Sequence, residues 1–253
     1  MRIPMVVGNW KMNKTADSVA AFVDGIKGNL PEARQIETAI CAPSLFLEQL
    51  VNHTREMPIE IGAENCYFED NGPFTGETSP YALSKAGVDL VILGHSERRK
   101  IFRETDEMIN LKVQAVFRNH MRPIICCDET MGQRESNDAV HWVVAQVIEA
   151  LKGVDEEQAR TAIIAYEPSW AIGVGTPASP DQIEEGCYLI RQTVADVYDD
   201  DIADEVRVLY GGSVKPANIN VIMQKPDVDG VLVGNASLEP SSFLELISND
   251  PGK

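Results

Sequence analysis

Glu167 has the setting of a general base. It follows the apolar run Ala162–Ala165 and precedes Pro168, and a glycine-punctuated apolar loop, residues 170–175, comes next. Proline interrupts regular structure, so we expect a strand, an acid at its end and then a loop that can close as a lid. A base that must exclude water requires this order. The alternative is a solvated acid in an ordinary surface loop.

His95 and Lys11 are the next candidates. His95 follows the apolar run Val88–Gly94 and opens a helical pattern. A helix N-terminus disfavours positive charge, so we expect a neutral imidazole that donates a hydrogen bond to a carbonyl oxygen. Lys11 follows the first apolar run and offers a point charge. The alternatives are a structural histidine and a surface lysine.

Two glycine-containing turns are candidates for binding phosphate. Gly211-Gly212-Ser213 and Gly234-Asn235 each follow an apolar run, and backbone N–H groups in such turns can hold an anion. Gly173 on the expected lid can add a third donor. The alternative is a pair of tight turns that need glycine only for their backbone conformation.

The elements that must position these residues are eight short apolar or β-branched runs separated by helical patterns. The runs are continuous rather than alternating, which is typical of strands buried on both faces of a parallel sheet. Eight such units in 253 residues predict an α/β fold, a (β/α)8 barrel, with an open doubly wound sheet as the alternative. The runs are Ile3–Gly8, Ile36–Ala42, Ile59–Ala63, Val88–Gly94, Pro123–Cys127, Thr161–Tyr166, Val206–Tyr210 and Gly230–Gly234.

Three helices are clear from apolar periodicity: Thr105–Phe117, Ala139–Leu151 and a segment from Pro180 to about Tyr198. No linker, low-complexity tract or internal repeat divides the chain. We therefore expect one barrel domain over residues 1–253.

The unusual polar residues all follow the expected strands, at the barrel face where active sites lie. A carboxylate base, a neutral histidine, a lysine charge, a phosphate site and a lid together predict proton abstraction next to the carbonyl of a small phosphorylated sugar, through an enediol(ate). These residues are Asn9, Lys11, Glu64, Asn65, His95, Ser96, Glu97, Glu129, Glu167, Gly211-Gly212-Ser213 and Gly234-Asn235.

Composition narrows the partners and the compartment. The net charge of −17 argues against nucleic acid as a partner, although a local site can still bind an anionic small molecule. The five cysteines have neither a paired nor a metal-binding spacing, which favours free thiols in a reducing cytoplasm. No apolar run is long enough for a membrane span or a signal peptide.

Seven segments, in order along the chain, closely resemble the triosephosphate isomerase family. The resemblance runs from Arg2 to about Leu246 and implies a barrel that interconverts dihydroxyacetone phosphate and D-glyceraldehyde 3-phosphate without cofactor or metal. The segments are Gly8-Asn9-Trp10-Lys11-Met12-Asn13, Phe74-Thr75-Gly76-Glu77, Gly94-His95-Ser96-Glu97-Arg98-Arg99, Tyr166-Glu167-Pro168, Trp170-Ala171-Ile172-Gly173, Tyr210-Gly211-Gly212-Ser213-Val214 and Val233-Gly234.

The resemblance also implies roles for individual residues. Glu167 matches the base and His95 the electrophile, while Lys11 matches the charge that faces the developing oxyanion. Asn9 matches a supporting polar contact, and Glu97 matches an acid behind the site. The positions that match the phosphate-binding backbone are Gly173, Ser213, Gly234 and Asn235.

The family is usually a homodimer, and the resemblance implies that the loop Asn65–Thr78 inserts into the partner subunit, with Thr75 at its tip. Independently, Tyr67, Phe68 and Phe74 on one loop predict an exposed apolar patch that an interface would cover.

The chain departs from the family pattern at four places. Asn235 stands where glycine is usual, Pro177 stiffens the far end of the lid, and Cys127-Asp128 replaces the more usual Val-Gly. Glu64 stands where glutamine is common, and we expect it to be partly buried in the dimer with a raised pKa.

Two rival interpretations stay open from the residues. Another phosphosugar isomerase or synthase barrel would share the phosphate turns but not the joint placement of Lys11, His95 and Glu167. A non-catalytic scaffold that keeps the fold would have lost at least one of the three, and all are present.

Overall fold

A computed structural model describes residues 2–136, 139–171 and 177–248, with no side-chain description for residues 139 and 140. Eight strands lie in these ranges, and each coincides with one of the apolar runs in the sequence. They are β1 (Met5–Asn9), β2 (Glu37–Ala42), β3 (Glu60–Ala63), β4 (Leu90–Leu93), β5 (Arg122–Glu129), β6 (Ile163–Pro168), β7 (Arg207–Tyr210) and β8 (Gly230–Val233).

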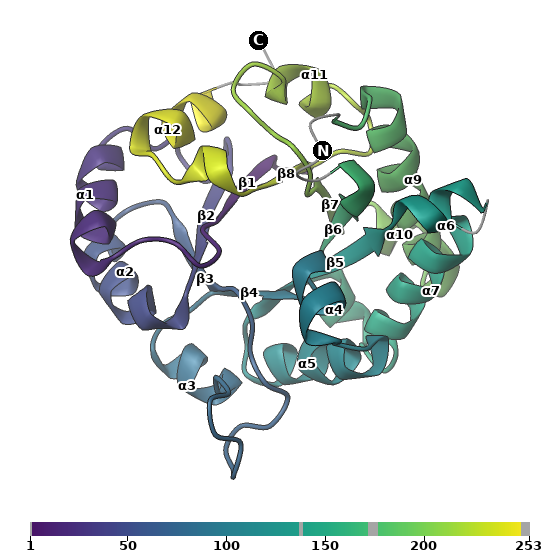
Figure 1. Ribbon diagram of the computed structural model, residues 1–253, viewed down its shortest axis with the longest axis horizontal. Helices are drawn as coiled ribbons and strands as arrows, with labels where there is room; N and C mark the ends of the chain where they lie inside the picture. Colours follow the sequence, from purple (N-terminus) through teal and green to yellow (C-terminus); the bar gives the residue numbers. More distant parts are fainter. Residues whose placement is uncertain (1, 137–138, 172–176, 249–253) are drawn as a thin grey trace.

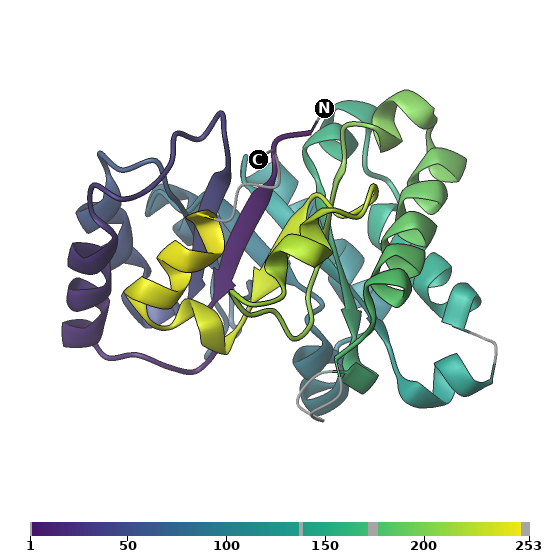
Figure 2. The ribbon, with the colours of Figure 1, turned by 90° about the horizontal axis from the view of Figure 1, so that it is seen from above.

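The strands form a closed barrel in which each pairs in parallel with its neighbour in sequence and β8 returns to β1. Figure 1 shows the helices as a ring around these strands. In the second view β1 and β8 lie side by side, with α12 (Pro240–Ser248) packed against them (Figure 2). The predicted (β/α)8 barrel is confirmed, and the open-sheet alternative is wrong.

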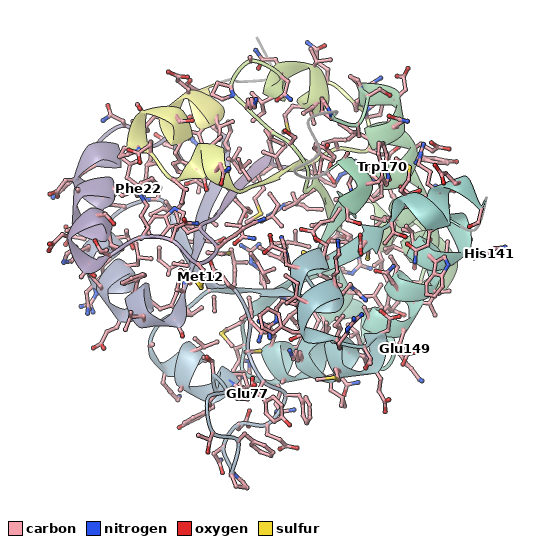
Figure 3. The ribbon with its side chains drawn as sticks, viewed as in Figure 1. Met12, Phe22, Glu77, His141, Glu149 and Trp170 are labelled. Carbon is pink, nitrogen blue, oxygen red and sulfur yellow. The ribbon has the colours of Figure 1, made fainter. Side chains whose placement is uncertain are left out.

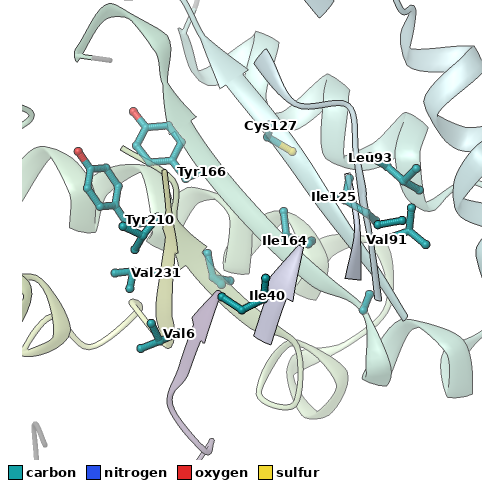
Figure 4. Close-up of a cluster of buried hydrophobic side chains, with 14 of the residues drawn as sticks. Val6, Ile40, Val91, Leu93, Ile125, Cys127, Ile164, Tyr166, Tyr210 and Val231 are labelled. Carbon is teal, nitrogen blue, oxygen red and sulfur yellow. The ribbon is translucent and has the colours of Figure 1, made fainter. Parts of the chain in front are cut away.

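Alternate strand residues pack on two different sides, as the pleat of a strand requires. One set fills the inside of the barrel and includes Met5, Cys126 and Ala165. The other set faces the helices and includes Ile40 and Tyr166, which Figure 4 shows among their neighbours. Both faces are buried, which is why the strand sequences read as continuous apolar runs.

The helices that cover the barrel include those predicted from periodicity, with ends that agree within one residue. Thr105 caps α5 and Ser179 caps α9, each accepting a backbone N–H with its hydroxyl. None of the described helices is long and apolar enough to span a bilayer. Together with α12, the described helices are α1 (Ala16–Ile26), α2 (Leu47–Thr54), α3 (Pro80–Lys85), α4 (Ser96–Phe102), α5 (Asp106–Arg118), α6 (Met131–Glu135), α7 (Ala139–Leu151), α8 (Glu156–Thr161), α9 (Pro180–Val197), α10 (Asp200–Ala203) and α11 (Ile219–Met223), with 3-10 turns at Ser44–Phe46, Ser169–Ala171 and Asn235–Ser237.

Strands β5 and β6 extend further than the sequence predicts. Their pairing continues through Asp128 with Glu167 and Glu129 with Pro168. We had expected Glu129 and Glu167 to follow their strands. They are instead part of β5 and β6. Proline is tolerated as the last residue of β6, where its missing N–H interrupts no further pairing.

Charged side chains gather at the amino end of the barrel. Arg207 donates to both carboxylate oxygens of Glu37 at 2.5 and 2.8 Å, and Arg122 pairs with Glu60 and Glu37. These residues belong to the starts of β7, β2, β5 and β3. Because this end is filled by mutually paired charges, the opposite, carboxyl end is left for a binding site.

Candidate active site

Glu167 projects into the carboxyl end of the barrel from β6 and is only 1% exposed. Its Oε2 accepts the backbone N–H of Ser96 at 2.7 Å, and its Oε1 lies 2.9 Å from His95 Nε2. Burial raises the pKa of Glu167, but His95 and Ser96 outweigh it, so the net direction is downward. The carboxylate is therefore ionised and held by two donors.

His95 is the N-cap of α4, and its ring nitrogens have different partners. Nδ1 accepts the backbone N–H of Glu97 at 3.2 Å, whereas Nε2 faces Glu167. Only an unprotonated nitrogen can accept a hydrogen bond, so this contact favours the tautomer with its proton on Nε2.

The sequence predicted a neutral His95 from its place at a helix N-terminus alone. That prediction did not include the nearby carboxylate of Glu167. Burial lowers the pKa of His95, but the carboxylate of Glu167 more than offsets it, and the net direction is upward. Protonation of Nδ1 would break the hydrogen bond that it accepts from the N–H of Glu97, and this contact favours the neutral ring. The increase in the pKa of His95 also depends on the contact between the Glu167 carboxylate and the imidazole ring.

Lys11 reaches across the barrel mouth to Glu97, with Nζ 2.7 Å from Oε1. Its backbone lies in the left-handed region at a φ of 53°, which costs about 1 kcal/mol for a residue with a side chain. The side chain of Asn9 supports this conformation by accepting the N–H of Lys11 at 3.1 Å. Lys11 Cε also lies 3.6 Å from where a Cβ on Gly234 would be.

The two glycine turns lie where the sequence predicted, directly after β7 and β8. Ser213 follows β7, and Gly234 precedes the 3-10 turn Asn235–Ser237. Gly211 has a specific steric role, because a Cβ there would lie 2.9 Å from Cγ of Glu167. The turns, Lys11 and Glu167 thus border one region. Gly173 lies outside the described residues.

The start of the expected lid is anchored on Glu129. This buried carboxylate accepts hydrogen bonds from the hydroxyl of Tyr166 at 2.5 Å and from Nε1 of Trp170 at 2.9 Å, and it pairs with Arg134 at 3.2 Å. Figure 3 shows Trp170 at this rim of the barrel. The sequence placed Glu129 at the rim but gave no sign of these partners, because they come from separate elements.

The structure brings Asn9, Lys11, His95, Glu97 and Glu167 to one end of the barrel. Sequence reasoning included Ser96 and Gly211 in the site but missed their contacts with Glu167: the Ser96 N–H holds its carboxylate, and Gly211 leaves room for it. Within the described ranges, no group of three His, Cys, Asp or Glu residues could hold a metal ion. The five cysteines are free and buried.

Comparison with known proteins gives one consistent result. The sequence profile of the triosephosphate isomerase family matches residues 4–250. The triosephosphate isomerase of Lactiplantibacillus plantarum is 54% identical over 248 residues, covering 98% of each chain. That of Pediococcus pentosaceus is also 54% identical, covering 98% of this chain and 99% of its own, and that of Lactobacillus acidophilus is 53% identical over 247 residues, covering 98% of each. The chain belongs to the triosephosphate isomerase family.

Proposed function

We propose that this protein is a triosephosphate isomerase that interconverts dihydroxyacetone phosphate and D-glyceraldehyde 3-phosphate by proton transfer through an enediol(ate). The observation that carries the proposal is the joint presence of Glu167, His95 and Lys11 at one end of the barrel, beside the turns after β7 and β8. We further propose that residues 1–253 form a single barrel domain.

In this mechanism Glu167 is the base. Its carboxylate leaves Ser96 and His95, removes a proton from the carbon next to the substrate carbonyl, and returns that proton to the adjacent carbon. Both donors that hold it in the free protein stabilise its anion, so leaving them makes the carboxylate a stronger base. Burial of Glu167 supports the role, because a dry carboxylate needs little reorganisation of water.

His95 and Lys11 act on the oxygen of the substrate. His95 carries its proton on Nε2 and donates it to the carbonyl oxygen as the enediolate forms. It regains a proton from the neighbouring hydroxyl group as that oxygen becomes the new carbonyl, and Lys11 offsets the negative charge that develops between these steps. Asn9 holds the backbone of Lys11, and Glu97 holds its ammonium group. These steps move protons only between protein and substrate and use neither metal nor cofactor.

The phosphate group lies against the backbone of Ser213, Gly234 and Asn235, with Gly173 contributing from the lid. Backbone N–H groups in such turns bind anions without bringing a mobile charge into the site. Lys11, close to Gly234, adds positive charge between the phosphate and the reacting carbons. This arrangement explains how a protein with a net charge of −17 can bind an anionic substrate.

We also propose a cytoplasmic homodimer. The connection 64–79 between β3 and α3 extends away from the barrel in Figure 1, and Glu77 marks it in Figure 3. The three aromatic rings of this loop pack on one another and are only partly exposed. Tyr67 stacks on Phe68 with ring centroids 4.1 Å apart and makes a tilted contact with Phe74 at 4.6 Å, and Phe74 is 37% exposed while the other two are half-buried.

Better support for the dimer comes from apolar side chains outside this loop. Met12 is 96% exposed and Leu45 83%, and Ile101 and Phe102 are also largely exposed. Exposed apolar groups of this size favour burial against a partner. Light scattering coupled to gel filtration should give twice the chain mass of 27.8 kDa, and a mass of one chain would contradict the dimer. Free, buried thiols support a reducing compartment.

The activity itself is tested with Glu167→Asp in a coupled assay of glyceraldehyde 3-phosphate isomerisation. The substitution retracts the carboxylate by about one C–C bond, so kcat should fall by roughly two orders of magnitude or more. Glu135→Asp makes the same change on an exposed helix and should leave kcat unaltered. Equal rates for wild type and Glu167→Asp would show that Glu167 is not the base, and an inactive wild type would refute the proposed function.

A further inference from the structure

Asp128 lies beside Glu167 on the neighbouring strand, at the same register. Two residues earlier on each strand, Cys126 and Ala165 both belong to the cluster inside the barrel. Alternate residues of a strand share a face, so Asp128 and Glu167 both point inward at the carboxyl end. Neighbouring strands are about 4.8 Å apart, which makes the two carboxyl groups close neighbours in one layer.

The backbone of Asp128 is fixed. The buried side chain of Gln146, on α7, accepts the N–H of Asp128 at 2.9 Å and donates to its carbonyl oxygen at 2.7 Å. This pair ties β5 to the helix behind it. The position of the Asp128 side chain is therefore set by the scaffold.

The side chain of Asp128 is only 9% exposed, and its polar groups are incompletely satisfied. Oδ1 is buried without a hydrogen-bond partner in the described part of the chain, while the hydroxyl of Ser169 bonds to the carboxylate. The same hydroxyl is 3.1 Å from the carbonyl oxygen of Glu129, and one hydroxyl proton can serve only one acceptor at a time. A buried, partly unpaired carboxylate costs stability, so its presence at this position needs an explanation.

The charged groups that face Asp128 come from two elements. Glu167 lies on β6, while Arg99 and His95 lie on α4 and at its start. Burial raises the pKa of Asp128, the hydrogen bond from Ser169 opposes this, and the negative charge of Glu167 raises it further. The negative charge of Glu167 thus acts on the ionisation of Asp128.

We propose that Asp128 is a positioning residue for Glu167: its negative charge lies on β5, between the base on β6 and the donors His95 and Ser96 that follow β4, so it opposes the resting contact of the base with these donors and favours its release toward the substrate. The proposal rests on the proposed function. Once Glu167 leaves its two donors to meet the substrate, the charge of Asp128 remains beside it. A carboxylate next to a like charge holds a proton more tightly, so Asp128 strengthens the base in the substrate complex.

The electrostatic part can be tested without catalysis. Carbon-13 NMR of protein labelled at aspartate carboxyl groups reports the titration of Asp128, assigned by its absence in Asp128→Asn. Glu167→Gln should lower the apparent pKa of Asp128, because it removes the neighbouring negative charge. An unchanged titration would mean that the two groups do not interact and would overturn the proposal.

The catalytic part is tested by the pH dependence of kcat in Asp128→Asn, Asp128→Gly and Asp128→Glu. A unit charge about 6 Å away at an effective dielectric constant of about 40 changes a proton affinity by about tenfold. Asp128→Asn and Asp128→Gly should therefore move the acid limb of kcat about one pH unit lower and reduce kcat about threefold, since catalysis follows basicity only in part. Asp128→Glu keeps the charge and should retain the wild-type profile.

A loss of packing alone would lower kcat or thermal stability without moving the acid limb. Profiles of Asp128→Asn and wild type that superimpose would overturn the proposal, as would a profile of Asp128→Glu that matches Asp128→Asn. An inactive wild type would contradict the proposed function, whereas an active wild type with unaltered Asp128 variants would contradict only the role of Asp128.

Discussion

Glu64 makes the stability of this protein depend on pH. It directly follows β3, and its Oε1 is buried without a hydrogen-bond partner in the described ranges. Burial raises the pKa of Glu64 to about 8, against the opposing N–H and charge of Lys11, and the nearby carboxylate of Glu97 adds to the increase. The pKa is thus raised already in the single chain, while the expected burial of Glu64 by a partner subunit, which would raise it further, stays a prediction.

The loss of folding stability caused by ionisation of Glu64 follows from proton linkage. Because the folded pKa exceeds the ordinary value of 4.5, stability is greatest below pH 4.5 and is lost as pH rises toward 8. At pH 7 the loss spans about 2.5 pH units at about 1.36 kcal/mol each, or about 3.4 kcal/mol. Solvent screens a partly exposed side chain, so we halve this to about 1.7 kcal/mol.

Glu64→Gln removes the ionisable group and keeps its size, so it should remove most of this cost. For a chain of this length 1 kcal/mol corresponds to about 2–4 °C, and the variant should melt about 5 °C above wild type at pH 7. At pH 5 the difference should shrink to about 1 °C, because this pH is only about half a unit above the ordinary value of 4.5 and little of the cost has yet accumulated.

The assay is thermal unfolding at equal protein concentration across pH 5 to 8.5, since melting of a dimer depends on concentration. Glu56→Gln is the matched control, an exposed carboxylate at the other end of the barrel that should melt like wild type at every pH. A difference between Glu64→Gln and wild type that is the same at pH 5 and pH 8 would refute the reasoning, as would a variant that melts lower than wild type at pH 7.

Two further substitutions test other contacts. Gly211→Ala places a methyl group 2.9 Å from Cγ of Glu167, so kcat should fall by at least tenfold with little change in melting temperature, and an unaltered kcat would show that the base has room to shift. Lys112→Ala removes one of two cations that pair with the buried Glu104 and leaves Arg98 2.6 Å away, so unfolding free energy should fall by about 1–3 kcal/mol in chemical denaturation, and an unaltered value would contradict this.

The strands were predictable because both of their faces are buried. Each inward residue meets the barrel interior and each outward residue meets a helix, so strands such as β4 and β8 are apolar at every position. Helix starts were predictable where the capping side chain is local, as at Thr105 and Ser179. The ends of β5 and β6 were not, because their last pairs form between residues about 40 positions apart.

Some features of the candidate site were likewise predictable from the sequence and others were not. The types and order of Lys11, His95 and Glu167 were visible in the sequence, since each follows a predicted strand. Their contacts were not, because the Ser96 N–H meets Glu167 across 71 positions and Lys11 meets Glu97 across 86. The charge of His95 shows the consequence: its local position at a helix start favours neutrality, whereas the distant carboxylate of Glu167 raises its pKa.

The roles of Asp128 and Glu64 could not be predicted from the sequence alone. Both are carboxylates with a buried oxygen that lacks a partner, and burial raises the pKa of each. The two carboxylates differ in the groups that lie next to them. Asp128 shares a layer with Glu167, so its charge can act on the proposed base, whereas Glu64 follows β3 beside Lys11 and Glu97. We therefore expect neutralisation of Asp128 to change the pH profile of kcat, and neutralisation of Glu64 to change stability while leaving that profile in place.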